Sequence, residues 1–180
     1  MRSNMSSPTN PSQKALNRAM REAVEFVHGE GWDAAPTLFA LVPTALLVDH
    51  IDIEADSAPL TLVVQDNLPD NIEPGSEQLA EYVARLAWPA EVAGVVLAQE
   101  IVFRDASQPA DAPRPARLFS GVLREDAVEL TLLQLRPTEE ELEAAGPFSQ
   151  DEIQLRGGPG VAPGVLAALR AGLEQDPEQV

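Results

Sequence analysis

One run of the sequence carries side chains that could bind a divalent metal ion. His50, Asp52 and Glu54 alternate with Ile51 and Ile53, so a strand here would place the three polar side chains on one outward row. An imidazole and two carboxylates form a ligand set that divalent cations accept. However, residues two apart on a strand lie about 6.6–7 Å apart at the backbone, and a solvent-facing strand surface has the same composition. No second histidine is nearby, so we expect no bound metal and no cofactor. His50, Asp52 and Glu54 are the candidate ligands if a metal does bind.

Glu100 is the best candidate for acid–base or ligand chemistry. It follows Gln99 at the point where an apolar strand becomes amphipathic, and Trp88 lies at the corner before that strand. These three residues could line a pocket. A lone carboxylate is a weak catalytic candidate without a partner of perturbed pKa. The interpretation that we favour is a solvated or ion-paired Glu100 near a strand end, with Arg117 or Arg124 as its partner.

Other familiar catalytic and phosphate-binding patterns are missing from the sequence. There is no cysteine, which excludes disulfides, thiol nucleophiles and thiolate metal sites. There is no Gly-x-Ser-x-Gly motif of the hydrolase type. The glycines of RGGPG (156–160) lack the preceding strand and the following Lys-Ser/Thr of a phosphate loop, so we interpret them as a linker. His28, followed by Gly29, is expected to cap the end of a helix. We therefore expect no catalytic residue.

The charge of the chain limits its partners. Twelve basic and 29 acidic residues give a net charge of −17. Binding to nucleic acid depends on cations that neutralise phosphates, and binding to an anionic membrane surface also needs cations, so we expect neither partner. A partner that is steered by charge would be basic. The sequence has no signal-peptide pattern and no long apolar span, so we expect a cytoplasmic protein.

The stretch from 76 to 103 organises the predicted fold. Four apolar residues recur on one stripe of a helix: Leu79, Tyr82, Val83 and Leu86. Trp88 and Pro89 then end this helix, because proline disfavours the helical conformation at the residue before it. From Val92 to Phe103 the pattern is that of a strand with apolar residues on both sides. Such a strand normally lies in the interior of a sheet with both faces covered.

The remaining segments predict an α+β fold with helices packed on a mixed or mostly antiparallel sheet of about five strands. We expect helices from 12 to 28, from 138 and from 163, strands at 39–42, 45–53 and 59–66, the last two paired, and a hairpin of 117–125 with 127–136 after a proline-rich loop at 104–116. We expect one domain over 12–174, in which 138–160 is an acidic insertion or linker. Residues 1–11 are expected to form a disordered tail and 175–180 a frayed end.

Several segments together resemble a family of conserved actinobacterial proteins of unknown function. They are FALVPTALL, LTLVVQDNLP, YVARLAWPAEVAGVVLAQE, SGVLRED and VAPGVLAAL. The resemblance spans about 13–174, and it implies no catalytic residue because the family has no assigned activity. Its most specific part is a W-P-x-x-V-x-G motif formed by Trp88, Pro89, Val92 and Gly94. The acidic segment from 137 to 160 is longer in this chain than in that family. The order of elements is also similar to that of small acidic secretion-chaperone-like folds, which bind other proteins.

Two functions are compatible with these observations. The first is a non-catalytic protein-interaction or chaperone-like adaptor module that presents a sheet face or groove to an unidentified protein, or that pairs with a second copy of itself through a strand edge. The alternative is a small-ligand binder or enzyme with acidic pocket residues. The identity of the partner or ligand does not follow from the sequence.

Overall fold

The structure is a computed structural model. It describes residues 11–44, 59–65, 68, 72–73, 76–103, 114–124, 128–136, 139–145, 156–157 and 163–174. The described helices are α1 (Pro11–Glu30), α3 (Glu77–Arg85), α4 (Glu139–Ala145) and α5 (Pro163–Glu174). The described strands are β1 (Thr37–Pro43), β2 (Leu60–Gln65), β3 (Gly94–Phe103), β4 (Arg114–Leu123), β5 (Glu129–Leu135) and β6 (Arg156–Gly157).

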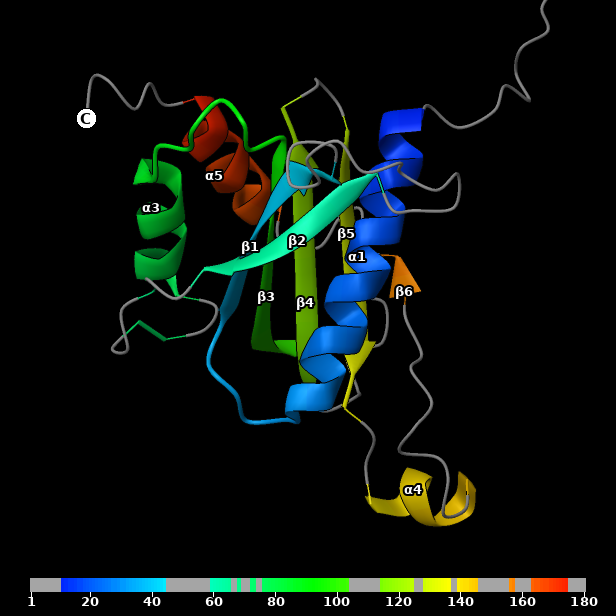
Figure 1. Cartoon of the computed structure of the whole chain (residues 1–180). Coiled ribbons are helices and arrows are strands. Elements are labelled where there is room, and N and C mark those ends of the chain that lie inside the picture. The colour runs from blue at the N-terminus through cyan, green and yellow to red at the C-terminus, as the bar shows by residue number, and fades with distance from the viewer. Residues whose placement is uncertain are drawn as a thin grey trace, which may run out of the picture.

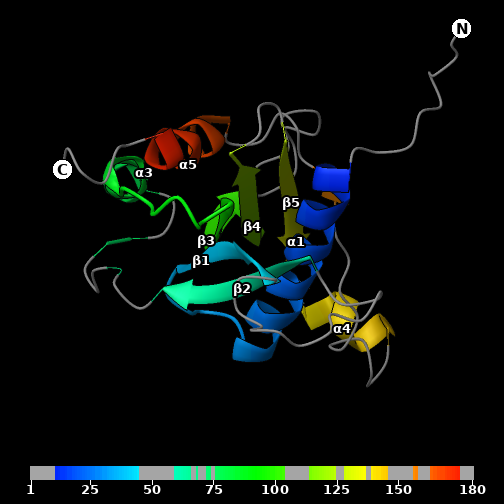
Figure 2. The ribbon, with the colours of Figure 1, turned by 45° about the horizontal axis from the view of Figure 1, so that its top comes forward.

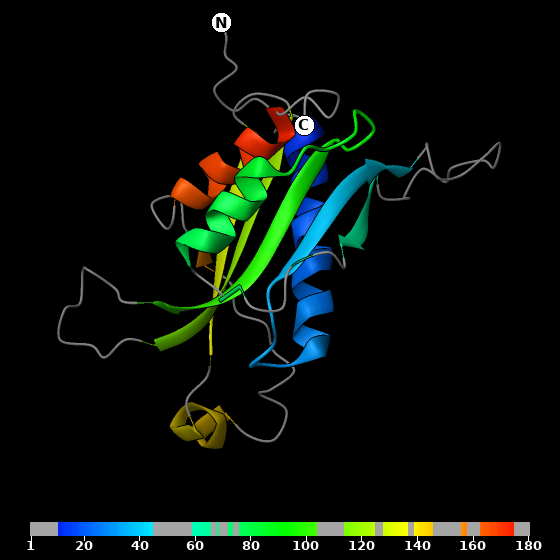
Figure 3. The same cartoon turned by 90° about the vertical axis from the view of Figure 1, so that its left-hand side faces the viewer.

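The strands form one antiparallel sheet in the order β2-β1-β3-β4-β5-β6. Helix α1 packs on one face, and α3 and α5 lie side by side on the other (Figures 1 and 3). The predicted α+β class, the antiparallel sheet and the cover on both faces are therefore confirmed. No helix among the described residues is long and apolar enough to cross a membrane.

Helix α1 covers its face of the sheet with a continuous apolar stripe. Its buried residues are Leu16, Ala19, Met20, Ala23, Val24 and Val27, which recur at the three- and four-residue spacing of one helical face. The predicted ends were slightly wrong. The helix begins at Pro11, whose missing N–H is harmless in a first turn, and it continues past Gly29 to Glu30. The left-handed glycine that follows it is Gly31, with a φ of 89°.

Strand β3 is the interior strand that the sequence predicted. Its alternating residues join two different cores: Val96 and Ala98 pack in the core under α1, whereas Val95 and Leu97 pack in the core under α3 and α5. Hydrogen-bonded neighbours on both sides, β1 and β4, complete the backbone ladder. Burial on both faces explains why this strand is apolar without alternation.

Helix α3 and its exit also follow the prediction. Ser76 caps the helix by accepting a hydrogen bond from the Leu79 N–H, and Leu79 and Val83 are buried. The helix ends at Arg85, and the backbone at Leu86 is already extended. The chain then turns at Pro89 and enters β3. The last helix, α5, begins at Pro163 as predicted.

Several strands differ from the prediction in their boundaries or partners. Strand β4 begins at Arg114, three residues earlier than expected, and pairs along its length with β3. Strand β2 pairs with β1, whereas the partner that we predicted, 45–53, lies outside the described residues. Arg156 and Gly157, which we interpreted as part of a linker, form the short strand β6 beside β5. The predicted tail at 1–11 lies outside the described residues except for Pro11, which begins α1. The predicted tail at 175–180, most of the proline-rich loop and most of the acidic segment also lie outside them.

Candidate functional site

The predicted pocket residues do not come together. Adjacent strand residues point to opposite faces, so Gln99 and Glu100 lie on different sides of β3. Gln99 is 5% exposed and is paired in register with Leu118. Trp88 is buried in the core under α3 and α5, before β3 begins. Glu100 lies directly opposite Arg117 on β4, and its Oε2 accepts a hydrogen bond from the Ala34 N–H at 2.8 Å.

Glu100 belongs to a polar cluster that fastens the connection between α1 and β1 to the sheet. We call this cluster the Trp32 clamp; it comprises Trp32, Asp33 and Ala34 from the connection and Glu100, Arg117, Gln134 and Arg136 from β3, β4 and the end of β5. Three consecutive residues of the connection are thereby bound to the sheet. The conformation is demanding, because Asp33 has a φ of 66°, which few residues other than glycine adopt.

Arg117 is the centre of the clamp. It is 1% exposed; its Nη1 donates to Gln134 Oε1 at 3.1 Å, and its Cζ lies 4.0 Å from the centroid of the Trp32 ring. Burial lowers the pKa of Arg117, and the nearby Glu100 carboxylate opposes this effect. Within the described part of the chain, Nε and Nη2 have no hydrogen-bond partner. The aromatic face and the opposed carboxylate therefore compensate much of the cost of burying this cation.

Arg136 binds the outer side of the same clamp. It forms an ion pair with Asp33 at 3.1 Å, and its Cζ lies 5.3 Å from the Trp32 ring centroid. The side chains of Arg136 and Asp33 are 38% and 76% exposed. Two cations thus face two carboxylates, and each group already has a role in holding the connection. Glu100 therefore has a structural role here, as a hydrogen-bond acceptor for the Ala34 N–H and as the charge opposite Arg117.

The Trp88 corner, residues 86–92, is fastened by Arg124. Its guanidinium donates hydrogen bonds to four backbone carbonyls: Val92 at 2.6 Å, Leu173 at 2.5 Å, Trp88 at 3.2 Å and Pro89 at 2.9 Å. The corner, the start of β3 and the end of α5 are thereby joined. Arg124, which we considered as a partner of Glu100, instead holds the segment that contains the W-P-x-x-V-x-G motif.

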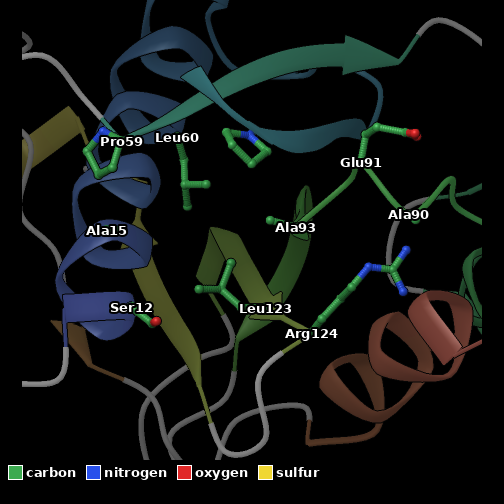
Figure 4. A pocket seen from close by; sticks show the side chains of 10 residues that line it. Ser12, Ala15, Pro59, Leu60, Ala90, Glu91, Ala93, Leu123 and Arg124 are labelled. Atoms are coloured by element: carbon green, nitrogen blue, oxygen red, sulfur yellow. The ribbon is translucent and has the colours of Figure 1, made fainter. Parts of the chain in front are cut away.

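Beside this corner the surface is hollowed into a groove of about 580 Å³, which we call the Leu60 groove (Figure 4). Its walls come from five segments far apart in the sequence. They are Ser12 and Ala15 of α1, Pro43 of β1, Pro59 and Leu60 at the start of β2, Ala90, Glu91 and Ala93 before β3, and Leu123 and Arg124 at the end of β4.

The lining of the groove favours contact with an apolar group. Its walls are mostly small apolar side chains, and the Arg124 guanidinium on its rim is already bonded to backbone carbonyls. Glu91 on the rim is exposed. An apolar floor with a polar rim is the usual composition of a protein interface.

The metal candidates His50, Asp52 and Glu54 lie outside the described residues. Among the residues that the structure describes, no group of three or more histidine or carboxylate side chains is placed to hold a metal ion.

The Leu60 groove and the Trp32 clamp were both missed by the sequence analysis. The groove is formed by five separate segments and has no local motif. One feature of the sequence did indicate the clamp. Arg117 and the buried Phe119 are two residues apart in β4, so their side chains point to the same face of the sheet, and a charged residue therefore lies on a core-facing position.

Comparison with known proteins finds one family. Residues 16–174 match the family described as PPA1309-like protein, and neither curated proteins nor solved structures show a significant match. The match runs from the first buried residue of α1 to the last residue of α5, in close agreement with the span of the resemblance noted in the sequence. An actinobacterial origin stays a prediction. Because the match covers most of the chain, this protein belongs to the PPA1309-like family.

Proposed function

We propose that this protein is a non-catalytic interaction module, chaperone-like in its mode of action, that binds an apolar side chain of a partner protein in the Leu60 groove. The observation that carries the proposal is the groove itself: an open apolar hollow whose rim arginine is already bonded to backbone carbonyls. The proposed site of action is the cytoplasm.

The partner's chemistry follows from the charge of the chain. With a net charge of −17, long-range attraction favours a basic partner and accelerates its encounter. The acidic rim residue Glu91 is exposed beside the apolar walls, whereas the Arg124 guanidinium on the rim is bonded to backbone carbonyls. We therefore propose that the partner presents an apolar side chain flanked by lysine or arginine. We expect salt to slow association because it screens the attraction between the charges. The contact of the partner's apolar side chain with the groove should persist at moderate salt.

Ala15→Glu tests this proposal directly. Ala15 is a half-buried residue of α1 that lines the groove, and glutamate is a good helix former. A carboxylate at this position would have to be buried without a partner when the groove is occupied. We expect retention of the partner to fall at least tenfold, equivalent to about 1.4 kcal/mol. The measurement is affinity capture of the tagged protein from its native lysate at low and moderate salt, with quantitative mass spectrometry of each retained protein.

The matched control is Ala167→Glu, the same change at an exposed helical position of α5. A near-stoichiometric basic protein retained by the wild type and by Ala167→Glu, but lost from Ala15→Glu, is the supporting result. Equal retention by all three proteins would reject the groove as the binding site. If the wild type retains only salt-labile background, the small-ligand alternative gains support, because a volume of about 580 Å³ also lies within the usual range of small-molecule sites.

A further inference from the structure

A different surface, the outer edge of β2, carries an inference that is independent of the Leu60 groove. Strand β2 is the last strand on its side of the described sheet, and Figure 2 shows it at the outer margin, with β1 on its inner side. Val63 and Val64 are 37% and 38% exposed, which is unusual for two consecutive apolar residues of a strand. Edge strands of natural proteins are commonly protected by charge, proline or a bulge. The six residues of β2, LTLVVQ, include no charge and no proline.

The hydrogen bonds of β1 determine which groups of β2 face outward. The Leu41 carbonyl accepts from the Ala93 N–H at 2.7 Å, on the β3 side. Because backbone groups alternate in direction along a strand, Leu38, Ala40 and Val42 point toward β2. Their register partners are Gln65, Val63 and Thr61.

The backbone N–H and C=O groups of Leu60, Leu62 and Val64 consequently point away from β1, along the outer edge. The bond from the Thr44 N–H to the Pro59 carbonyl, at 3.0 Å, agrees with this assignment. These outward groups form a row that a further strand could pair with.

We propose that a second copy of the chain occupies this edge, with the two β2 strands antiparallel and centred on Leu62. In this register Leu62 lies opposite Leu62 of the other copy, and Val64 lies opposite Leu60. All of these are outward-bonding residues, so the backbone groups match as hydrogen-bonded pairs. On the opposite face, Val63 lies opposite Thr61.

The uncharged composition of β2 is what makes this edge compatible with a second copy. Two chains of net charge −17 repel each other, so they can associate only where no acidic groups are brought together. Strand β2 meets this condition, since every pair in the proposed register is uncharged. Strand β2 itself carries no acidic side chain with which a basic partner could pair. The contact is self-complementary, as a two-fold symmetric dimer requires.

The test of this inference is the molar mass in solution, measured by light scattering and sedimentation. We expect the wild type to have twice the chain mass of 19.3 kDa. Val64→Pro removes an N–H that points outward and leaves the β1 ladder intact, because proline is tolerated at such edge positions. Val64→Lys would bury a charge against Leu60 of the other copy. Both variants are expected to be monomers with unchanged circular dichroism.

Val102→Lys is the matched control, since Val102 is a 70% exposed valine on β3, and this variant should remain dimeric. A wild type that stays at 19.3 kDa at the highest concentration it tolerates would overturn the proposal. So would a dimer that Val64→Pro and Val64→Lys leave intact. Affinity capture tests the Leu60 groove and molar mass tests the β2 edge, so failure of one proposal can be distinguished from failure of the other.

The absence of native cysteine allows a second test that reports the register. Residues 61 and 63 of opposite copies would form a non-hydrogen-bonded pair with Cα atoms about 4.5 Å apart, within the range of a disulfide. A mixture of Thr61→Cys and Val63→Cys proteins should form a disulfide-linked dimer on oxidation, whereas each variant alone should not. Cross-linking by either variant alone would contradict the register, and no cross-linking in the mixture would contradict the pairing of β2.

Discussion

Replacing Arg117 with alanine is expected to lower the free energy of unfolding by about 3–5 kcal/mol, the range found when a buried charge loses the opposite charge that compensates it. Arg117 is 1% exposed, so its side chain leaves a cavity beneath Trp32. The change also leaves the half-buried Glu100 carboxylate without the cation opposite it in register. Urea denaturation followed by far-ultraviolet circular dichroism measures the loss, and tryptophan fluorescence reports the release of the connection.

Arg136→Ala is the matched control for this variant. Both arginines stack on the Trp32 ring, at 4.0 and 5.3 Å from its centroid, but the Arg136 side chain is 38% exposed and its ion-pair partner Asp33 is 76% exposed. Exposed ion pairs contribute roughly 0–1 kcal/mol, so the expected loss is about 1 kcal/mol or less. Equal losses for the two arginines would mean that stacking, rather than the buried charge, determines the stability of the clamp.

A double variant separates the charge from the packing. Arg117→Met with Glu100→Gln removes both charges, keeps a long side chain under Trp32 and leaves an oxygen that can accept from the Ala34 N–H. Replacing buried charged groups of opposite sign by well-packed neutral groups often changes stability little. We expect the double variant to be more stable than Arg117→Ala. If the double variant were as unstable as Arg117→Ala, the positive charge of Arg117 beneath the Trp32 ring would itself be required for stability.

The sequence predicted the elements well because their patterns are local. The three- and four-residue spacing of Leu79 and Val83 identified α3, and the proline at 89 identified its end. The apolar residues on both sides of β3 predicted an interior strand and cover on both faces. These features depend on periodicity and on the chemistry of proline, which need no knowledge of distant residues.

The clamp could not be predicted in the same way, because its partners lie in four separate parts of the chain. Arg117 was considered as a partner of Glu100, and the register confirms that they lie opposite each other. The aromatic face over Arg117 comes from Trp32, which no pattern in the strands indicates. Ala34 contributes through its backbone N–H, a group that every residue except proline carries and that sequence cannot distinguish.

The pocket candidates were grouped because they are close in sequence. Gln99 and Glu100 are neighbours in sequence, so they seemed to share a site, but the alternation of a strand separates them by the full thickness of the sheet. The Leu60 groove is formed by the ends of several elements. Their meeting depends on strand order, which the sequence did not determine.

Gly172→Ala is expected to destabilise the protein by about 1–3 kcal/mol, the usual cost of forcing an extra methyl group into a close-packed contact. A Cβ at this position would lie 2.5 Å from the Val83 carbonyl oxygen and 3.1 Å from that of Leu86. Both are backbone atoms of α3 and its exit, which cannot move away as the end of a side chain could. Helices α3 and α5 would have to separate, and the Trp88 indole nitrogen, 3.4 Å from the same point, would shift with them.

Gly164→Ala on the same helix isolates this effect. A Cβ at Gly164 meets nothing within 4 Å, so the change brings only the helix propensity of alanine, a gain of up to about 1 kcal/mol. The same intrinsic gain acts at position 172, and a loss of stability there must therefore come from the contact with α3. The midpoint temperature of thermal unfolding should fall for Gly172→Ala and should rise or stay unchanged for Gly164→Ala. If Gly172→Ala were as stable as Gly164→Ala, the close approach of α5 to the Trp88 corner would not be the constraint that requires glycine.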